Sequence, residues 1–191
     1  MKSILIILLL PIFTFGQEQG DFDYVFKNLD SAIARPDQVY HLDLSKQKLQ
    51  NIPEEIFLFN NLLSLNLSRN KISLIPAGIR NLTRLEILDL SKNSITILPP
   101  QLFELSQLKE LHLSKNSIEA IPPEIEGLKS VIKIDLWQNE IKSIAENIEN
   151  CSQLEILDVR GMIISDELQK RLNELLPLAT IHYSNACDCK N

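Results

Sequence analysis

Two consecutive segments of the sequence, residues 62–84 and 85–107, read LLSLNLSRNKISLIPAGIRNLTR and LEILDLSKNSITILPPQLFELSQ. Each has 23 residues, with Leu or Ile at positions 1, 4, 6, 11, 14, 18 and 21, Asn at position 9 and Pro at position 15. A fixed period of this kind indicates a repeat protein, in which each unit buries its apolar side against the next unit.

The period extends in both directions from these two segments. The first positions of six successive units are Val39, Leu62, Leu85, Leu108, Val131 and Leu154. Over residues 39–176 the sequence resembles the leucine-rich-repeat superfamily, and the 23-residue form is similar to plant Ras-group-related and bacterial members. The resemblance implies an α/β fold: a curved solenoid of six repeats, the last one atypical, with a parallel concave sheet. It also implies that the partner is most often a protein.

The residues themselves support this architecture. The alternation Leu65-Asn66-Leu67 has the two-residue period of a strand. A strand that returns every 23 residues must pair in parallel with its neighbour. Pro76 and its equivalents cannot donate to a sheet, so they suit an extended or short helical return segment.

One polar position recurs among the apolar ones. An Asn side chain has both a donor and an acceptor, and at the corner after each strand it can satisfy backbone groups that water cannot reach. We therefore predict a structural ladder with no other function. Gln47 and Met162 replace Asn in the first and last repeats, and the four members are Asn70, Asn93, Asn116 and Asn139.

Both ends of the repeat array carry amphipathic segments. We predict an N-terminal helical cap at 21–38, with a helix over 21–35 that Pro36 ends. A second helix is expected after Ser165, which is a favourable N-cap, followed by a strand at 179–183 within the C-terminal segment 177–191. Capping of both ends predicts a complete domain that contains no catalytic module.

The outward strand positions of the predicted concave face form columns about 4.8 Å apart. Trp137 interrupts a column of four serines, and a Trp beside an Arg is typical of an interface hot spot. We predict that the C-terminal half of this face binds the partner through Trp137, Arg160, His112, Asp135, Asp158, Lys133 and Ile156. The alternative is that Trp137 packs against the last turn as part of the cap.

The charged columns also have a simpler interpretation. A column of Asp residues lies beside a basic column of Lys46, Arg69, Lys92 and Lys115, and the two can neutralise each other as exposed pairs. The row of Asp89, His112 and Asp135 could hold a divalent metal, but its site is open and its carboxylates belong to the repeat pattern. We expect no metal and no cofactor.

The first 16 residues predict export. Lys2 precedes an apolar run, and Thr14 and Gly16 place small residues before a cleavage at Gln17. The run is short for a membrane span, so we expect no stable membrane insertion after its removal, although an uncleaved anchor is the alternative. We expect the protein to be periplasmic or extracellular. At most one disulfide can form among the three cysteines, Cys151, Cys187 and Cys189.

The net charge and the motifs of the sequence argue against two classes of function. The net charge of −6 argues against nucleic-acid binding. The sequence has no nucleophile elbow, phosphate-binding loop or His-rich metal motif, so we do not expect an enzyme. The prediction is an exported module that binds a protein through its concave face. The alternatives are a binder of cell-surface glycan or peptide, and a structural spacer.

Overall fold

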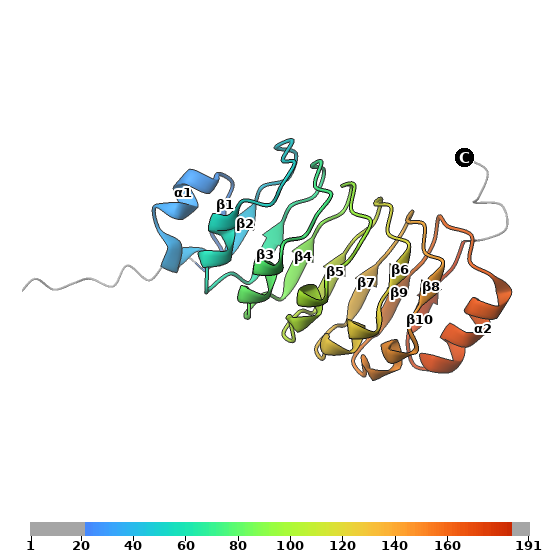
Figure 1. The fold of residues 1–191 in the computed structure, drawn as a ribbon. Helices are drawn as coiled ribbons and strands as arrows, with labels where there is room; N and C mark the ends of the chain where they lie inside the picture. The colour runs from blue at the N-terminus through green and yellow to red at the C-terminus, as the bar shows by residue number, and fades with distance from the viewer. Residues whose placement is uncertain (1–21, 185–191) are drawn as a thin grey trace, which may run out of the picture.

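The structure, a computed structural model, describes residues 22–184. Within this range the strands lie side by side in one row, and the chain winds through them as a solenoid (Figure 1). The predicted signal peptide, Cys187 and Cys189 lie outside the described residues. The main sheet has the order β1-β2-β3-β4-β5-β7-β9-β10. Its strands are β1 (Val25–Phe26), β2 (His41–Asp43), β3 (Ser64–Asn66), β4 (Ile87–Asp89), β5 (Glu110–His112), β7 (Lys133–Asp135), β9 (Ile156–Asp158) and β10 (Thr180–His182).

The strand pairing follows the 23-residue period. Every pair is parallel, and Leu42 pairs with Leu65, which pairs in turn with Leu88. These leucines are at most 1% exposed, because their side chains form one continuous row inside the solenoid. A slip of one residue would turn the whole row towards solvent, so the apolar pattern specifies the register. The parallel sheet expected from the sequence is confirmed.

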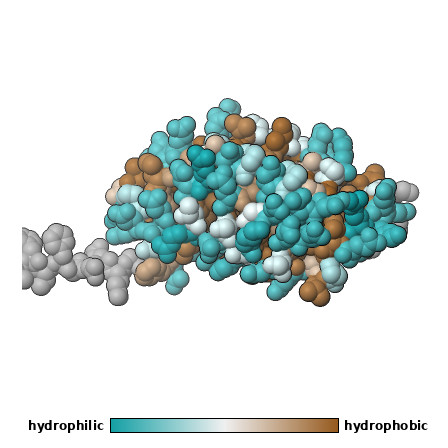
Figure 2. All heavy atoms as spheres, turned by 60° about the horizontal axis from the view of Figure 1, so that its bottom comes forward, coloured by the Kyte–Doolittle hydropathy of each residue, from teal (hydrophilic) through white to brown (hydrophobic). Residues whose placement is uncertain are grey.

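The return segments are short 3-10 helices, one in each of five repeats. They stack along the lower edge in Figure 1, opposite the narrow turns that follow the strands. Figure 2 brings this edge forward and shows mainly hydrophilic residues, with hydrophobic groups scattered between them. The helices are Glu54–Leu58, Ala77–Asn81, Pro100–Glu104, Pro123–Gly127 and Glu146–Asn150.

A second, smaller sheet forms where the proline pattern is broken. Its strands are β6 (Ala120–Ile121) and β8 (Ser143–Ile144), which pair in parallel. Ala145 stands where the preceding repeat has Pro122, and its N–H donates to the carbonyl of Ile121 at 3.0 Å. Proline has no N–H, so the earlier repeats lack this hydrogen bond. The change from Pro to Ala thus lets the return segments of these two repeats pair.

The N-terminal cap is helical, but the helix is shorter than predicted. The expected helix over 21–35 is wrong in its first part, because β1 extends the main sheet there and buries Phe26. Helix α1 (Leu29–Ile33) begins only after Asn28, whose side chain accepts the N–H groups of Asp30 and Ser31. A one-turn 3-10 helix, Pro36–Gln38, leads into β2.

The C-terminal cap has the helix and strand expected from the sequence. Helix α2 (Asp166–Leu175) starts where the hydroxyl of Ser165 accepts the N–H of Leu168, and its Leu172 is fully buried in the core. Strand β10 then pairs with β9. No helix within residues 22–184 has the length and apolar character needed to cross a membrane.

Candidate functional site

The residues proposed from the sequence lie on three adjacent strands or, for Trp137 and Arg160, two residues after a strand ends. His112, Asp135 and Asp158 are the last residues of β5, β7 and β9, and they pair in register. Lys133 and Ile156, the first residues of β7 and β9, pair in the same way. These side chains share the face of the sheet opposite the buried leucine rows, as the two-residue period of a strand requires.

The acidic column on this face supports the backbone. Each of its Asp or Asn side chains accepts the N–H of the residue two positions later, at 2.8–3.1 Å, which closes the turn after the strand. The hydrogen bonds of the turns therefore account for Asp or Asn at these positions independently of any binding site. The acceptors are Asp43, Asn66, Asp89, Asp135 and Asp158.

The next turn residue has a left-handed backbone in every repeat. The φ angles lie between +53° and +60° at five non-glycine residues and reach +74° at Gly161. This conformation is costly for residues with a Cβ and free for glycine. The five residues are Lys46, Arg69, Lys92, Lys115 and Gln138.

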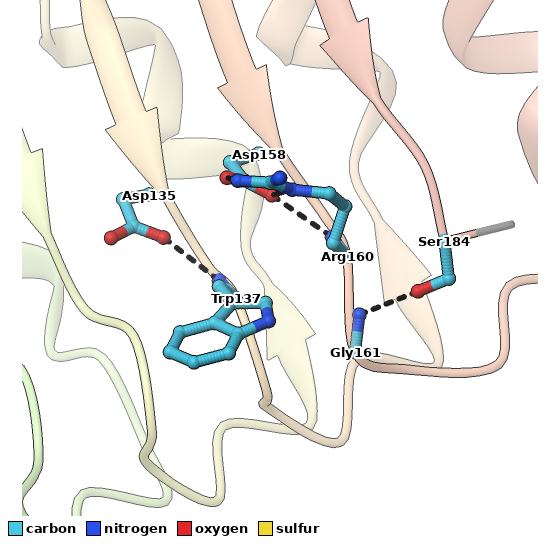
Figure 3. Close-up of polar contacts among 6 residues, drawn as sticks. All are labelled: Asp135, Trp137, Asp158, Arg160, Gly161 and Ser184. Atoms are coloured by element: carbon cyan, nitrogen blue, oxygen red, sulfur yellow. Dashed lines mark hydrogen bonds and ion pairs between the residues drawn. The ribbon is translucent and has the colours of Figure 1, made fainter. Parts of the chain in front are cut away.

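Trp137 lies at the end of β7, beside the last turn of the solenoid (Figure 3). Its ring is partly buried. A Cβ atom added to Gly161 would lie 3.0 Å from the indole Nε1, so the glycine leaves the space that the ring uses. On the preceding repeat, the Nζ of Lys115 lies 4.4 Å from the ring centroid. Trp137 thus packs against the last turn and also presents surface to solvent, and its role in binding a partner stays a prediction.

Arg160 folds back onto Asp158 (Figure 3). Its Nη2 lies 2.6 Å from Oδ2, and its Nε lies 3.0 Å from Oδ1. Burial alone would raise the pKa of Asp158, but the hydrogen bonds and charge of Arg160, together with His182, lower it overall. Asp158 is only 8% exposed, so it reaches a partner chiefly through Arg160.

His112 has a different partner from those of the proposed metal row. Its Nε2 lies 3.0 Å from Oε2 of Glu110 on the same strand, while Asp89 and Asp135 each bind a turn N–H. Across residues 22–184 no three His, Cys, Asp or Glu side chains are grouped as a metal site would require. The imidazole is instead a polar group on the open face.

Cys151 is a core residue. It takes the place that Leu82, Leu105 and Leu128 have in earlier repeats, and it is 2% exposed. Burial raises the pKa of its thiol to about 11, and Sγ lies 3.4 Å from the carbonyl oxygen of Ile125. A thiol in this setting is protonated at neutral pH and is a poor nucleophile.

The repeated asparagines bind backbone groups of two repeats. Asn116 is buried; its Nδ2 donates to the carbonyls of Leu90 and Leu113, and its Oδ1 accepts the N–H of Ile95. Asn139 has the equivalent bonds one repeat later. Asn70 and Asn93 also bond across the repeat boundary.

Two grooves of the surface lie away from Trp137. One of about 440 Å³ lies on the flank between the third and fourth repeats, lined by Thr96, Ile97, Leu98, Glu119, Ala120 and Pro122. The other, of about 370 Å³, lies between α2 and the last 3-10 helix, lined by Glu146, Glu167, Lys170, Arg171, Glu174 and Leu175. Trp137 lines neither groove.

Two residues that lie beside Trp137 were not among the site residues predicted from the sequence. Lys115 was assigned to a basic column, and its contact with Trp137 crosses between two columns. Gly161 is the one glycine in that basic column, and a lone glycine in a column of long side chains is a signal for positive φ or a close approach.

Comparison with known proteins gives a consistent result. A family model described as "Leucine-rich repeat region" matches residues 42–180. A solved structure of a leucine-rich-repeat protein from Leptospira interrogans is similar, with 30% sequence identity and a TM-score of 0.58. The matched region covers 70% of this chain and 40% of the Leptospira protein, so this chain spans less than half of that protein's length. No curated protein matches the chain.

Proposed function

Because this chain belongs to the leucine-rich-repeat family, we propose that it is an exported, non-catalytic module that binds a protein through the concave face of its sheet. Proteins of this family generally bind other proteins, and the matched region includes every strand from β3 to β9. Fold alone does not supply function, so the proposal depends on the chemistry of specific residues.

The observation that carries the proposal is the position of Trp137. It follows Ser45, Ser68, Ser91 and Ser114 in one column, where the fold accepts a small polar residue. Its ring remains partly exposed between Lys115 and Gly161. A Trp held in place by its neighbours loses little conformational entropy on binding and offers a large apolar surface.

The surroundings of Trp137 suit a macromolecular partner. Lys133 and Ile156 lie in register on β7 and β9, and the guanidinium of Arg160 stands on the same face. An aromatic and an arginine surrounded by polar residues correspond to the centre and rim of a protein interface.

Export is supported by the sequence of residues 1–16. Its test is cell fractionation of the full-length chain, followed by N-terminal sequencing of the recovered protein. We expect protein outside the cytoplasm that begins at Gln17. An intact Met1 on cytoplasmic protein would overturn this part of the proposal.

Binding is tested by affinity capture from the cell envelope and culture fluid of the producing organism. The wild-type chain is compared with Trp137→Ala and with the control Leu178→Ala, which removes a 95% exposed leucine after α2. Arg160 is left unchanged, because its loss would leave the buried Asp158 without its charge partner. Thermal unfolding of each variant verifies that it is folded.

We expect a protein that wild type and Leu178→Ala retain and Trp137→Ala loses. Equal retention by all three would place the interface away from Trp137 and overturn the site. Retention of a glycan, with no protein, would favour the alternative ligand class. If wild type retains nothing, the protein-binding proposal fails and a structural spacer is favoured.

A further inference from the structure

Four cationic residues follow the ends of four consecutive strands. We call Lys46, Arg69, Lys92 and Lys115 the basic ladder. The backbone N–H of each donates to the carbonyl of the residue before the equivalent position in the next repeat, for example from Lys92 to Ser114 at 2.7 Å and from Lys115 to Trp137 at 2.7 Å. Because adjacent turns are bonded as adjacent strands are, the ladder positions are about 4.8 Å apart.

The charges of the basic ladder are not neutralised within the described residues 22–184. The Lys and Arg residues that form ion pairs there are elsewhere: Lys109, Lys142, Arg160, Lys170 and Arg171. Lys46 and Arg69 are exposed, as are Lys48 and Lys71, which add a second cation to each of the first two turns. A row of like charges repels itself, and a partner of opposite charge would relieve that repulsion.

The backbone does not account for the choice of Lys and Arg at these positions. All four ladder residues have φ between +57° and +60°, where glycine is the residue without steric cost. The last repeat does have glycine there, Gly161. Long cationic side chains therefore occupy four backbone positions that do not favour them, which points to a role for the side chains.

We propose that the basic ladder binds an acidic segment of the protein partner, extended along the turn edge of the sheet as far as Trp137. This inference rests on the proposed protein-binding function and names the chemistry of the partner. The ladder and the aromatic site are continuous, because the Nζ of Lys115, the last rung, lies 4.4 Å from the Trp137 ring centroid.

A polypeptide fits the surface better than another polyanion does. Each residue of the Asp column precedes a ladder residue by three positions in the sequence. The carboxylate oxygens of this column accept hydrogen bonds from N–H donors. A peptide brings N–H donors together with its carboxylates, whereas the phosphates of a nucleic acid accept only. Trp, the residue on which bases stack well, occurs once in the chain.

The test is fluorescence anisotropy with the full chain and a labelled peptide of about ten glutamates, with a glutamine peptide as the neutral probe, at low and at physiological salt. The ladder variant combines Lys46→Gly, Arg69→Gly and Lys92→Gly. Glycine suits the positive φ, so the variant should remain folded. The control combines Lys129→Gln, Lys142→Gln and Lys170→Gln, which remove the same charge elsewhere.

We expect the glutamate peptide to bind wild type and control alike, to bind more weakly as salt rises, and to lose roughly tenfold or more in affinity for the ladder variant. No binding to wild type, or equal binding to the ladder variant, would overturn the inference. Tighter binding of single-stranded DNA or a sulfated polysaccharide of equal charge would also overturn it.

The two proposals fail in different ways. If a captured protein depends on Trp137 while the glutamate peptide does not bind, the proposed function stands and the ladder inference fails. If the peptide binds through the ladder while wild type captures no protein, the proposed function fails and the ladder's preference for acidic chains stands.

Discussion

The Nζ of Lys115 lies 4.4 Å from the centroid of the Trp137 indole ring, and the two residues belong to adjacent repeats. On the other side of the ring, Gly161 leaves the space that a larger residue would fill. Residues of three successive repeats thus determine how the one tryptophan of the chain is presented. Such preorganisation reduces the entropy lost when a partner binds.

The first prediction concerns this contact. Replacing Lys115→Met keeps much of the side-chain length but removes the charge over the ring. The free energy of unfolding should fall by about 0.5–1 kcal/mol, the usual contribution of a cation–π contact near a surface. The fluorescence spectrum of the single tryptophan should change, and Lys115→Arg should preserve it. Identical spectra for wild type and Lys115→Met would contradict the contact.

Gly161→Ala should disturb Trp137. The added Cβ would approach Cγ of Gln138 to 2.5 Å and Nε1 of the indole to 3.0 Å, at a backbone φ of +74°. We expect a loss of about 1–3 kcal/mol in the free energy of unfolding, together with altered tryptophan fluorescence. Lys92→Ala is the control, because it places alanine at the equivalent left-handed position two repeats away from Trp137. A fluorescence change in both variants would show that the effect does not arise at the ring.

Lys92→Gly should not destabilise the protein. Relief of the left-handed conformation at φ +57° offsets the greater entropy of glycine in the unfolded chain, so the free energy of unfolding should rise by up to about 1 kcal/mol. Lys71 lies in the turn of the preceding repeat, and its backbone φ is not positive. Lys71→Gly should therefore lower the free energy of unfolding by about 0.5–1 kcal/mol. Chemical denaturation of the two variants should therefore give shifts of opposite sign.

Asn116→Ala should be strongly destabilising. It leaves the buried N–H of Ile95 without its acceptor, and it removes one of the two Asn donors from the carbonyls of Leu90 and Leu113, which keep Asn93 and Asn139. One unsatisfied buried donor costs about 1–3 kcal/mol, and the two further hydrogen bonds that are lost bring the expected total to about 2–4 kcal/mol. Asn81→Ala, at an exposed position of a 3-10 helix, should change the free energy of unfolding by less than about 0.5 kcal/mol. Equal effects would contradict the structural role of the ladder.

Asp158→Asn should act in a pH-dependent way. An amide oxygen can still accept the N–H of Arg160, as Asn66 does for Ser68, but the ion pair is lost. Because the pKa of Asp158 is lowered in the folded protein, its contribution is present above the ordinary aspartate value of about 3.9 and is lost as the pH falls through the lowered pKa.

We therefore expect Asp158→Asn to cost about 1–2 kcal/mol at pH 7 and progressively less as the pH falls below about 3.9, by urea unfolding at each pH. Asp43→Asn is the matched control, since Asp43 accepts the equivalent turn N–H and forms no ion pair within residues 22–184. It should show little difference at either pH. A constant deficit for Asp158→Asn across the range would contradict the ion pair.

Where the sequence prediction erred, a non-repeating segment was involved. Phe22, Phe26, Leu29 and Ile33 have helical spacing, yet β1 takes Phe26 into the sheet and Ile33 remains 44% exposed. Hydrogen bonding to the open edge of β2 outweighs the helical preference of this short segment. The spacing of apolar residues does not reveal this competition between helix and strand, because the edge of β2 forms only when the repeats have stacked.

The sequence by itself determined the repeat number, the parallel register and the columns of the concave face. Each repeat places the same residue types against the same neighbours, so one period defines every contact between equivalent positions. Only the tertiary structure decided the contacts between non-equivalent positions, which are Lys115 over Trp137, Arg160 on Asp158 and His112 on Glu110. It also decided the pairing of β6 with β8. These depend on side-chain rotamers and on single departures from the repeat, which periodicity does not encode.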